Sequence, residues 1–265
     1  MRRDVQAHMT LDVQRASTLV LEVAVADEPG WTLEEHWDVT LDGRPIEPRE
    51  LRVEHGTRWH VLDAEPGALR IDYRATVTGR SGPAPVAEAD LLRYRRPSRY
   101  SESDTLGPTA RAQFAGLVGA DLLAAVSSWV GTQLSYVPGS SGPTDGAVST
   151  LLARQGVCRD YAHLVVALLR ALDVPARLVA VYAPGLDPMD FHAVAEAYVD
   201  DAWRVVDATT LAPRSTLVRI ATGRDASDTA FLSVHHGVAV LGELSVTAVA
   251  DVLPDDDVRT LVALG

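Results

Sequence analysis

The sequence predicts an α+β fold, in which an N-terminal β-rich domain precedes a core of helices packed on an antiparallel sheet. Three observations support this class. Between residues 8 and 95, short alternating apolar runs are separated by turn-forming residues. A long apolar stripe at helical spacing then follows Cys158. Two further strand-like runs flank the turn Asp200-Asp201 and predict a hairpin. We therefore expect a β-rich domain over residues 1–95 and a core with C-terminal strands over residues 96–265.

The N-terminal domain is expected to be an antiparallel sandwich. Apolar and polar residues alternate in four runs, at residues 9–13, 18–25, 57–62 and 69–77. Turn signals lie between them, and short strands separated by turns are typical of a sandwich. The histidines of this region lack metal-ligand spacing, so we interpret them as surface or packing residues: His8, His36, His55 and His60.

The composition limits the partners that we expect. The chain has 265 residues, a formal net charge of −12 and a pI of about 5.0, which argues against a nucleic-acid partner. No apolar run approaches the ~18 residues of a membrane span, and the first residues lack the apolar core of a signal peptide. One cysteine and no such signal predict a reducing, cytoplasmic setting. No motif indicates a cofactor or a metal, and the sequence leaves the oligomeric state open.

Three helices are expected before the cysteine. Pro108 suits the first turn of one helix, and Asp121 the start of the next. Thr144-Asp145 offers N-cap chemistry for a short helix that ends near Arg154. Trp129, on the second helix, is a candidate to line a cleft, although a Trp on an apolar face belongs more often to the core.

Cys158 is the only cysteine and therefore forms no internal disulfide. Gly156 before it, and the apolar helical period after it, place Cys158 in the first turn of a helix. The thiolate, which is the nucleophilic form, is favoured at that position by free N–H groups and the helix dipole. The helix is expected to be buried and to end at Asp173-Val174-Pro175, because Pro175 disfavours helical geometry in the residue before it.

Three polar neighbours of Cys158 have separate interpretations. Asp160 is expected to accept backbone hydrogen bonds in the first turn of the helix. His163 lies about 140° round the helix from Cys158 and is interpreted as a hydrogen-bonded packing residue. Gln155 is a candidate donor to an oxyanion, as is the backbone N–H of Cys158.

The hairpin permits a test of register. If Asp200-Asp201 alone form the loop, Val194 lies opposite Asp207, and His192 lies opposite Thr209. His192 and Asp207 then share a face on the diagonal, close enough for their side chains to meet. A three-residue loop would place Asp207 on the opposite face.

Cys158, His192 and Asp207 are the residue types of a nucleophile, its base and the group that orients the base. Asp190, two residues before His192, shares the face of His192 on a strand and is the alternative partner. Neither arrangement needs a cofactor.

Three segments carry a family resemblance. Residues 156–164, Phe191-His192-Ala193 and residues 206–209 closely resemble the transglutaminase-like core of bacterial proteins. Residues 96–104 and 218–226 extend the match. The resemblance implies a papain-like arrangement, with a cysteine at a helix start packed on a sheet that carries His and Asp. It leaves the reaction open, since the superfamily includes transglutaminases, proteases, amidases and chains without activity.

Three functions follow as hypotheses. The first is a cysteine protease- or amidase-type hydrolase, in which water releases an acyl group from Cys158. The second is a transglutaminase, in which an amine intercepts the same acyl-enzyme. The third is a catalytically quiet binding module. The third is disfavoured because all three residue types of a triad are present, whereas the motifs do not separate the first two. We favour the first, with a peptide or amide substrate.

Two charged segments are interpreted as structural. Arg93, Arg95, Arg96 and Arg99 form a basic cluster that is either a contact for a substrate carboxylate or phosphate, or a linker paired with acidic residues. We favour the linker. The acidic residues between 251 and 257 are expected to form a solvated tail.

Overall fold

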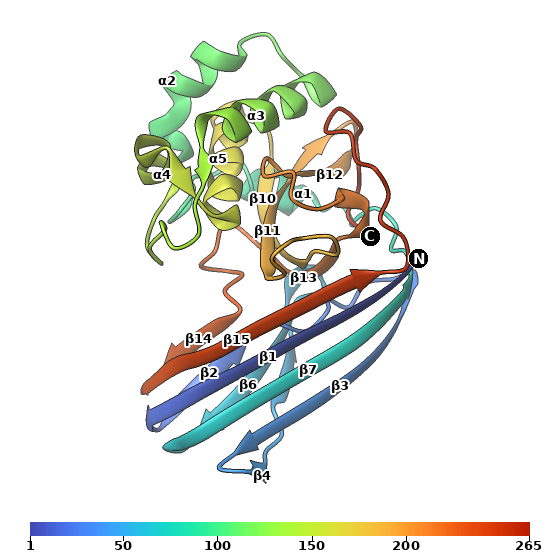
Figure 1. Cartoon of the computed structure of the whole chain (residues 1–265). Coiled ribbons are helices and arrows are strands. Elements are labelled where there is room, and N and C mark those ends of the chain that lie inside the picture. Colours follow the sequence, from blue (N-terminus) through green and yellow to red (C-terminus); the bar gives the residue numbers. More distant parts are fainter.

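The computed structural model describes all 265 residues, and its lower part is a sandwich of two antiparallel sheets (Figure 1). One sheet has the order β15-β1-β7-β3-β4, and the other has the order β14-β2-β6-β5. The strands of the first sheet are β1 (Arg2–Arg15), β3 (Trp31–Leu41), β4 (Arg44–Pro45), β7 (Gly67–Gly79) and β15 (Val238–Ala250). Those of the second are β2 (Ser17–Leu21), β5 (Arg49–Arg52), β6 (Arg58–Ala64) and β14 (Leu232–His235), and the short helix η1 (Glu54–Gly56) joins β5 to β6.

Alternation of apolar and polar residues builds this sandwich. In β1 every second side chain is buried, and these inward residues are Arg3, Val5, Ala7, Met9, Leu11 and Val13. The predicted sandwich is therefore confirmed. Strand β3 was not among the predicted runs. Its four residues from Glu34 to Trp37 break the alternation of apolar and polar side chains, and its outward side chains are exposed.

The last two strands return to the sandwich. Strand β15 pairs with β1 and β14 pairs with β2, so strands far apart in the sequence lie side by side. The prediction that these C-terminal strands belong to the second domain is wrong. Their alternation identifies them as strands, but their partner is set by the open edges of β1 and β2, which no local pattern reveals.

The second domain contains a four-stranded antiparallel sheet, β12-β11-β10-β13, and its two longest helices pack against this sheet (Figure 1). These strands are β10 (Ala176–Tyr182), β11 (Phe191–Val199), β12 (Ala202–Val206) and β13 (Val218–Gly223). The helices are α1 (Glu88–Arg93), α2 (Ser103–Phe114), α3 (Gly119–Gln133), α4 (Ala147–Ala153) and α5 (Cys158–Ala171). The short strands β8 (Ser135–Tyr136) and β9 (Gln155–Gly156) pair in parallel, and η2 (Arg214–Thr216) precedes β13. The predicted α+β class is confirmed.

Helix α5 is the buried centre of this domain, as predicted. Its residues from Asp160 to Arg170 are all buried, and it ends before Pro175. The start predicted for the first helix is wrong, since Pro108 lies inside α2 rather than in its first turn. The buried residues Leu106, Ala110 and Phe114 draw the helix against the core over that whole length, and this packing outweighs the one backbone hydrogen bond that Pro108 cannot make.

The two domains share one continuous interior. Tyr182 of β10 donates a hydrogen bond from its hydroxyl to the Val23 carbonyl (2.8 Å), and Ile220 of β13 packs into the apolar core of the sandwich. The guanidinium of Arg219 is buried between Glu196 of the core sheet and Glu28 of the sandwich. This contact fixes the sheet against the sandwich, and the surface between them is where the site lies.

The acidic residues between 251 and 257 are mostly exposed, as expected, but they do not form a free tail. Asp256 accepts hydrogen bonds from the backbone and the guanidinium of Arg214, at 2.9 and 2.8 Å, and Leu264 is buried. Arg214 is itself buried, and its need for a counter-charge holds this segment on the core. No single helix of the chain is long and apolar enough to cross a membrane, although the bent pair 107–114 and 119–133 meets that test jointly.

Candidate active site

The N-terminus of α5 presents Cys158 half-buried at its first position. Asp160 accepts a hydrogen bond from the Val157 N–H (2.8 Å) and one from the Ser141 hydroxyl (2.9 Å), which confirms its expected place in the first turn. Gly156 is required here, because a Cβ at this position would lie 2.7 Å from Cβ of Asp160. The turn thus leaves the remaining N–H groups of the helix start beside the thiol.

The hairpin β11–β12 carries the two other predicted residues. Its register pairs Ala195 with Val206, and its two loop residues, Asp200 and Asp201, both have positive φ (49° and 57°). The predicted two-residue loop is therefore confirmed, and its geometry suits a tight primed turn. This register brings His192 and Asp207 to the same face.

Nε2 of His192 lies 2.8 Å from Oδ2 of Asp207, and both side chains are buried. The other carboxylate oxygen of Asp207 accepts hydrogen bonds from the N–H and the hydroxyl of Thr209, at 2.9 and 2.7 Å. Burial opposes the charged form of Asp207, but the charge and the hydrogen bond of His192 outweigh it and lower the pKa of Asp207. Asp207 is thus held as a carboxylate that fixes the ring of His192.

The second nitrogen of His192 is available to the thiol. Nδ1 is buried without a partner of nitrogen or oxygen. Burial would lower the pKa of His192, but Asp207 and then the neighbouring Cys158 raise it to about 10. Sγ of Cys158 lies 4.0 Å from the carbonyl oxygen of Phe191, the residue before His192. The structure therefore brings Cys158, His192 and Asp207 together in the predicted order.

A cavity of about 440 Å³ opens beside Cys158 and His192. The core sheet, the sandwich and the segment after β13 all contribute to its wall. Its apolar lining includes Leu178, Ala180, Phe191, Ile220, Phe231 and Leu244. A pocket between two packed domains, apolar with few polar groups, is the usual form of a small-molecule or side-chain site.

The comparisons with known proteins agree with this geometry. A family profile described as the transglutaminase-like superfamily matches residues 116–208. The crystal structure of a candidate cysteine protease from Cytophaga hutchinsonii is 32% identical and aligns with a TM-score of 0.86, over 100% of this chain and 93% of that one. This chain belongs to the transglutaminase-like superfamily.

Curated relatives of this superfamily member match over shorter segments. An uncharacterized protein of Mycobacterium leprae is 28% identical over 114 residues, which are 40% of this chain and 41% of the relative. An uncharacterized protein of Mycobacterium tuberculosis is 38% identical over 74 residues, or 26% of this chain and 24% of the relative. The matches thus span less than half the length of these curated relatives.

Asp190 is not the partner of His192. Its Oδ1 accepts a hydrogen bond from the Phe191 N–H (2.7 Å), and it lines the cavity on the side of the thiol. Desolvation by surrounding atoms raises the pKa of Asp190. Asp207 occupies the position that the resemblance to the transglutaminase-like superfamily implies for the orienting carboxylate.

Two other candidates lie outside the cavity. Gln155 is exposed on β9 and is absent from the cavity wall, so the structure does not support it as an oxyanion donor. The parallel pairing of β9 with β8 fixes its backbone there.

Trp129 packs edge-on against Phe114 with ring centroids 5.8 Å apart, in the apolar cluster around α5, and does not line the cavity. Its position on the apolar face of α3 packs it, partly buried, against the core.

Sequence reasoning missed Tyr136 and Glu22. Tyr136 pairs with Gly156 across β8 and β9, which brings its hydroxyl to Cys158; burial and then the thiol raise the pKa of Tyr136 to about 12. Glu22 lines the cavity directly after β2. A signal for Glu22 exists in the sequence, because it is the one charged residue in the apolar run from Leu19 to Val25.

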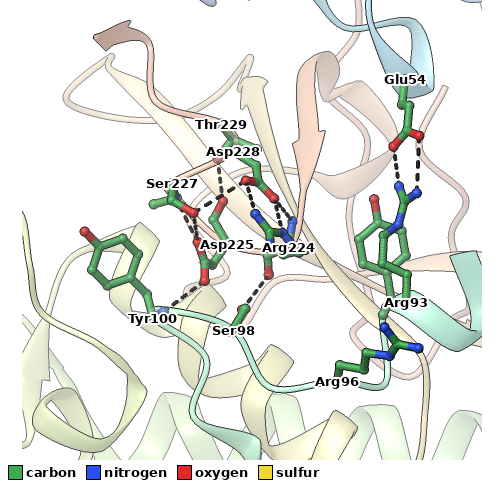
Figure 2. Close-up of polar contacts among 12 residues, drawn as sticks. Glu54, Arg93, Arg96, Ser98, Tyr100, Arg224, Asp225, Ser227, Asp228 and Thr229 are labelled. Atoms are coloured by element: carbon green, nitrogen blue, oxygen red, sulfur yellow. Dashed lines mark hydrogen bonds and ion pairs between the residues drawn. The ribbon is translucent and has the colours of Figure 1, made fainter. Parts of the chain in front are cut away.

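The two outer segments of the resemblance meet beside α5. The Tyr100 N–H donates to Asp225 (2.9 Å), and Asp225 also accepts from Ser227, as Figure 2 shows. His163 accepts from the Ala226 N–H (3.1 Å), and burial lowers the pKa of His163 to about 3, so it is neutral. His163 is the packing histidine that we expected, and it fixes the loop that forms one wall of the cavity.

Two arginines of the cluster pair with acidic residues, as expected of a linker. Arg93 forms an ion pair with Glu54 of the sandwich (Figure 2), and Arg95 lies 3.6 Å from Asp173. The guanidinium of Arg99 lies over the ring of Tyr100, 4.9 Å from its centroid. No group of three His, Cys, Asp or Glu side chains in the structure is arranged to hold a metal ion.

Proposed function

We propose that the protein is a thiol acyl-transfer enzyme that hydrolyses amide or peptide bonds. The observation that carries this proposal is the position of His192, which has the Asp207 carboxylate on one nitrogen and Cys158 beside the other. A structural cysteine would not need an oriented, buried histidine–carboxylate pair next to it. In this pair His192 is the general base, and Asp207 orients it.

In the first half of the proposed reaction, the Cys158 thiolate attacks the substrate carbonyl carbon and forms a C–S bond. The backbone N–H of Cys158 lies at the helix start, where it can donate to the resulting oxyanion. The C–N bond then breaks, and the imidazolium of His192 gives its proton to the leaving amine. The high pKa of His192 keeps this proton in place at neutral pH until the amine departs.

In the second half, His192 removes a proton from water as the water oxygen attacks the thioester. The C–S bond breaks, a carboxylic acid leaves, and Cys158 returns as a thiolate beside the imidazolium. The net change is the addition of one water to one amide bond. Asp207 keeps Nδ1 of His192 directed at the thiol throughout, because it holds Nε2.

Hydrolysis is favoured over amine transfer by a relative that matches over the whole of this chain. The Cytophaga hutchinsonii protein, which covers this whole chain at 32% identity, bears the name of a candidate cysteine protease. Transfer of the acyl group to an amine uses the same thioester and the same three residues, so it is an outcome that the experiment must detect.

The experiment is a peptide-library digest read by mass spectrometry, with and without an added primary amine such as cadaverine. Products that gain one water, formed by the wild type and not by Cys158→Ala, would establish hydrolysis. Products that instead carry the amine would identify a transglutaminase. If no product forms and iodoacetamide alkylates Cys158 equally fast in the wild type and in His192→Ala, the acyl-transfer proposal is wrong and the chain is a binding module.

A further inference from the structure

One carboxyl group in the cavity wall takes no part in the proposed reaction. Glu22 follows β2, and its backbone N–H donates to the Phe231 carbonyl (3.0 Å). The residue is only 5% exposed, and its Oε2 has no hydrogen-bond partner. An unpaired buried carboxyl costs free energy, so its presence in an apolar wall points to a partner supplied from outside the chain.

The surroundings of Glu22 explain why it is unsatisfied. Burial raises the pKa of Glu22 to about 8, the indole of Trp59 opposes that shift, and the nearby Asp228 adds to it. No arginine or histidine forms an ion pair with Glu22, although most buried acids of this chain have such a partner, as Glu196 has Arg177. No group of the chain therefore supplies a counter-charge to Glu22.

An apolar path joins the thiol to Glu22. The carbonyl oxygen of Phe191 lies 4.0 Å from Sγ of Cys158, and the ring of Phe191 stacks on that of Phe231 with centroids 5.3 Å apart. Phe231 in turn accepts the backbone hydrogen bond of Glu22. A ligand that follows these rings needs an aliphatic stem and a polar end.

The charges around the cavity favour a cation at that end. Asp190 stands on the wall together with Glu22, and Asp228 lies close behind. The two basic groups of the wall already have partners. His192 is paired with Asp207, and Arg159 donates to the Gly142 carbonyl (2.7 Å) and lies 3.4 Å from Asp160. A net charge of −12 adds a negative field that attracts cations to the surface.

We propose that Glu22 is a specificity residue of the acyl-transfer site and binds a primary ammonium group at the end of an aliphatic chain. The substrate class is thus an acyl compound or peptide with a lysine-like side chain that lies along Phe191 and Phe231. This inference rests on the proposed function for its biological meaning, but the binding site itself does not depend on turnover.

The test measures protection of Cys158 against iodoacetamide, which needs only an accessible thiol. Pentylamine and 1-pentanol are compared as probes of equal length at pH 8. The ammonium form is expected to slow alkylation at a concentration at least ~10-fold lower than the alcohol, since a charge-assisted hydrogen bond is worth about 1.5–3 kcal/mol. Glu22→Gln keeps the shape of the side chain and is expected to remove this difference.

Glu22→Leu is the second variant, and it is expected to reverse the preference towards the alcohol. Protection is expressed relative to the alkylation rate of each variant without a probe, and urea unfolding shows whether each variant is folded. Equal protection by both probes in the wild type, or an unchanged preference in Glu22→Gln, would overturn the inference. If pentylamine protects Cys158 but no peptide is turned over, the ammonium site is supported and the proposed hydrolysis is contradicted.

Discussion

Asp207 binds the side of His192 that faces away from Cys158, with Oδ2 of the carboxylate 2.8 Å from Nε2 of the ring. The contact is buried, and Thr209 holds the other carboxylate oxygen through its N–H and hydroxyl. His192 therefore has one orientation, and that orientation directs Nδ1 to the thiol.

Asp207→Asn is expected to reduce acyl transfer by about 10³-fold, because the amide removes the charge that stabilises the imidazolium and can select the wrong tautomer. The pKa of His192 should fall from its raised value, since the Asp207 carboxylate is the largest factor that raises it. An NMR titration of the ring and single-turnover kinetics measure the two effects.

Asp190→Asn is the matched control for that variant. Asp190 stands two residues from His192 but bonds the Phe191 N–H, so its replacement should change the His192 titration little. If Asp190→Asn lowered the pKa of His192 as far as Asp207→Asn does, Asp207 would not be the orienting group.

The residues that form this site were predictable because their relationships are local. The apolar period after Cys158 defines α5, and the two-residue loop at Asp200-Asp201 sets the register of His192 and Asp207 by counting alone. The wall of the cavity was not predictable in the same way. Glu22 and Leu244 reach it only because β14 and β15 return to β2 and β1, a pairing between open strand edges that no local pattern encodes.

Trp129 and Gln155 show the same limit in the second domain. Gln155 lies near Cys158 in the sequence, and Trp129 lies on a helix that packs near it. Both types of side chain are suited to line a cleft. The apolar face of α3 turns Trp129 into the core, and the pairing of β9 with β8 leaves Gln155 in solvent. Which face an element buries depends on its neighbours in space, so residue type alone could not place them.

Cys158→Ala is expected to abolish acyl transfer and to leave the fold intact. The thiol is half-buried, and its contact with the Phe191 carbonyl is a weak one at 4.0 Å, so its loss should cost about 1 kcal/mol of unfolding free energy or less. Activity assays and urea unfolding measure both effects. A variant that unfolds would show instead that Cys158 has a packing role.

Gly156→Ala is expected to destabilise the start of α5. The added Cβ would lie 2.7 Å from Cβ of Asp160, so the turn must shift, at a cost of about 1–3 kcal/mol. The shift should also slow alkylation of Cys158, because Asp160 sets the first turn. Gly82→Ala is the control, since nothing lies within 4 Å of its added Cβ. Equal stability of the two variants in urea would contradict the close packing at Gly156.

Glu22→Gln is expected to make the protein more stable, and more so as the pH rises. The pKa of Glu22 is raised from 4.5 to about 8 in the folded protein, so between these values the folded state holds a proton that the unfolded state has lost. Stability from this group therefore falls as the pH increases through that window, by an amount on the order of a few kcal/mol.

Gln carries no such proton. The difference in unfolding free energy between variant and wild type should thus grow from pH 5 to pH 8 and level off above it, as urea titrations at each pH would measure. A difference that stays constant over this range would show that Glu22 has an ordinary pKa in the folded protein, because a partner stabilises its carboxylate.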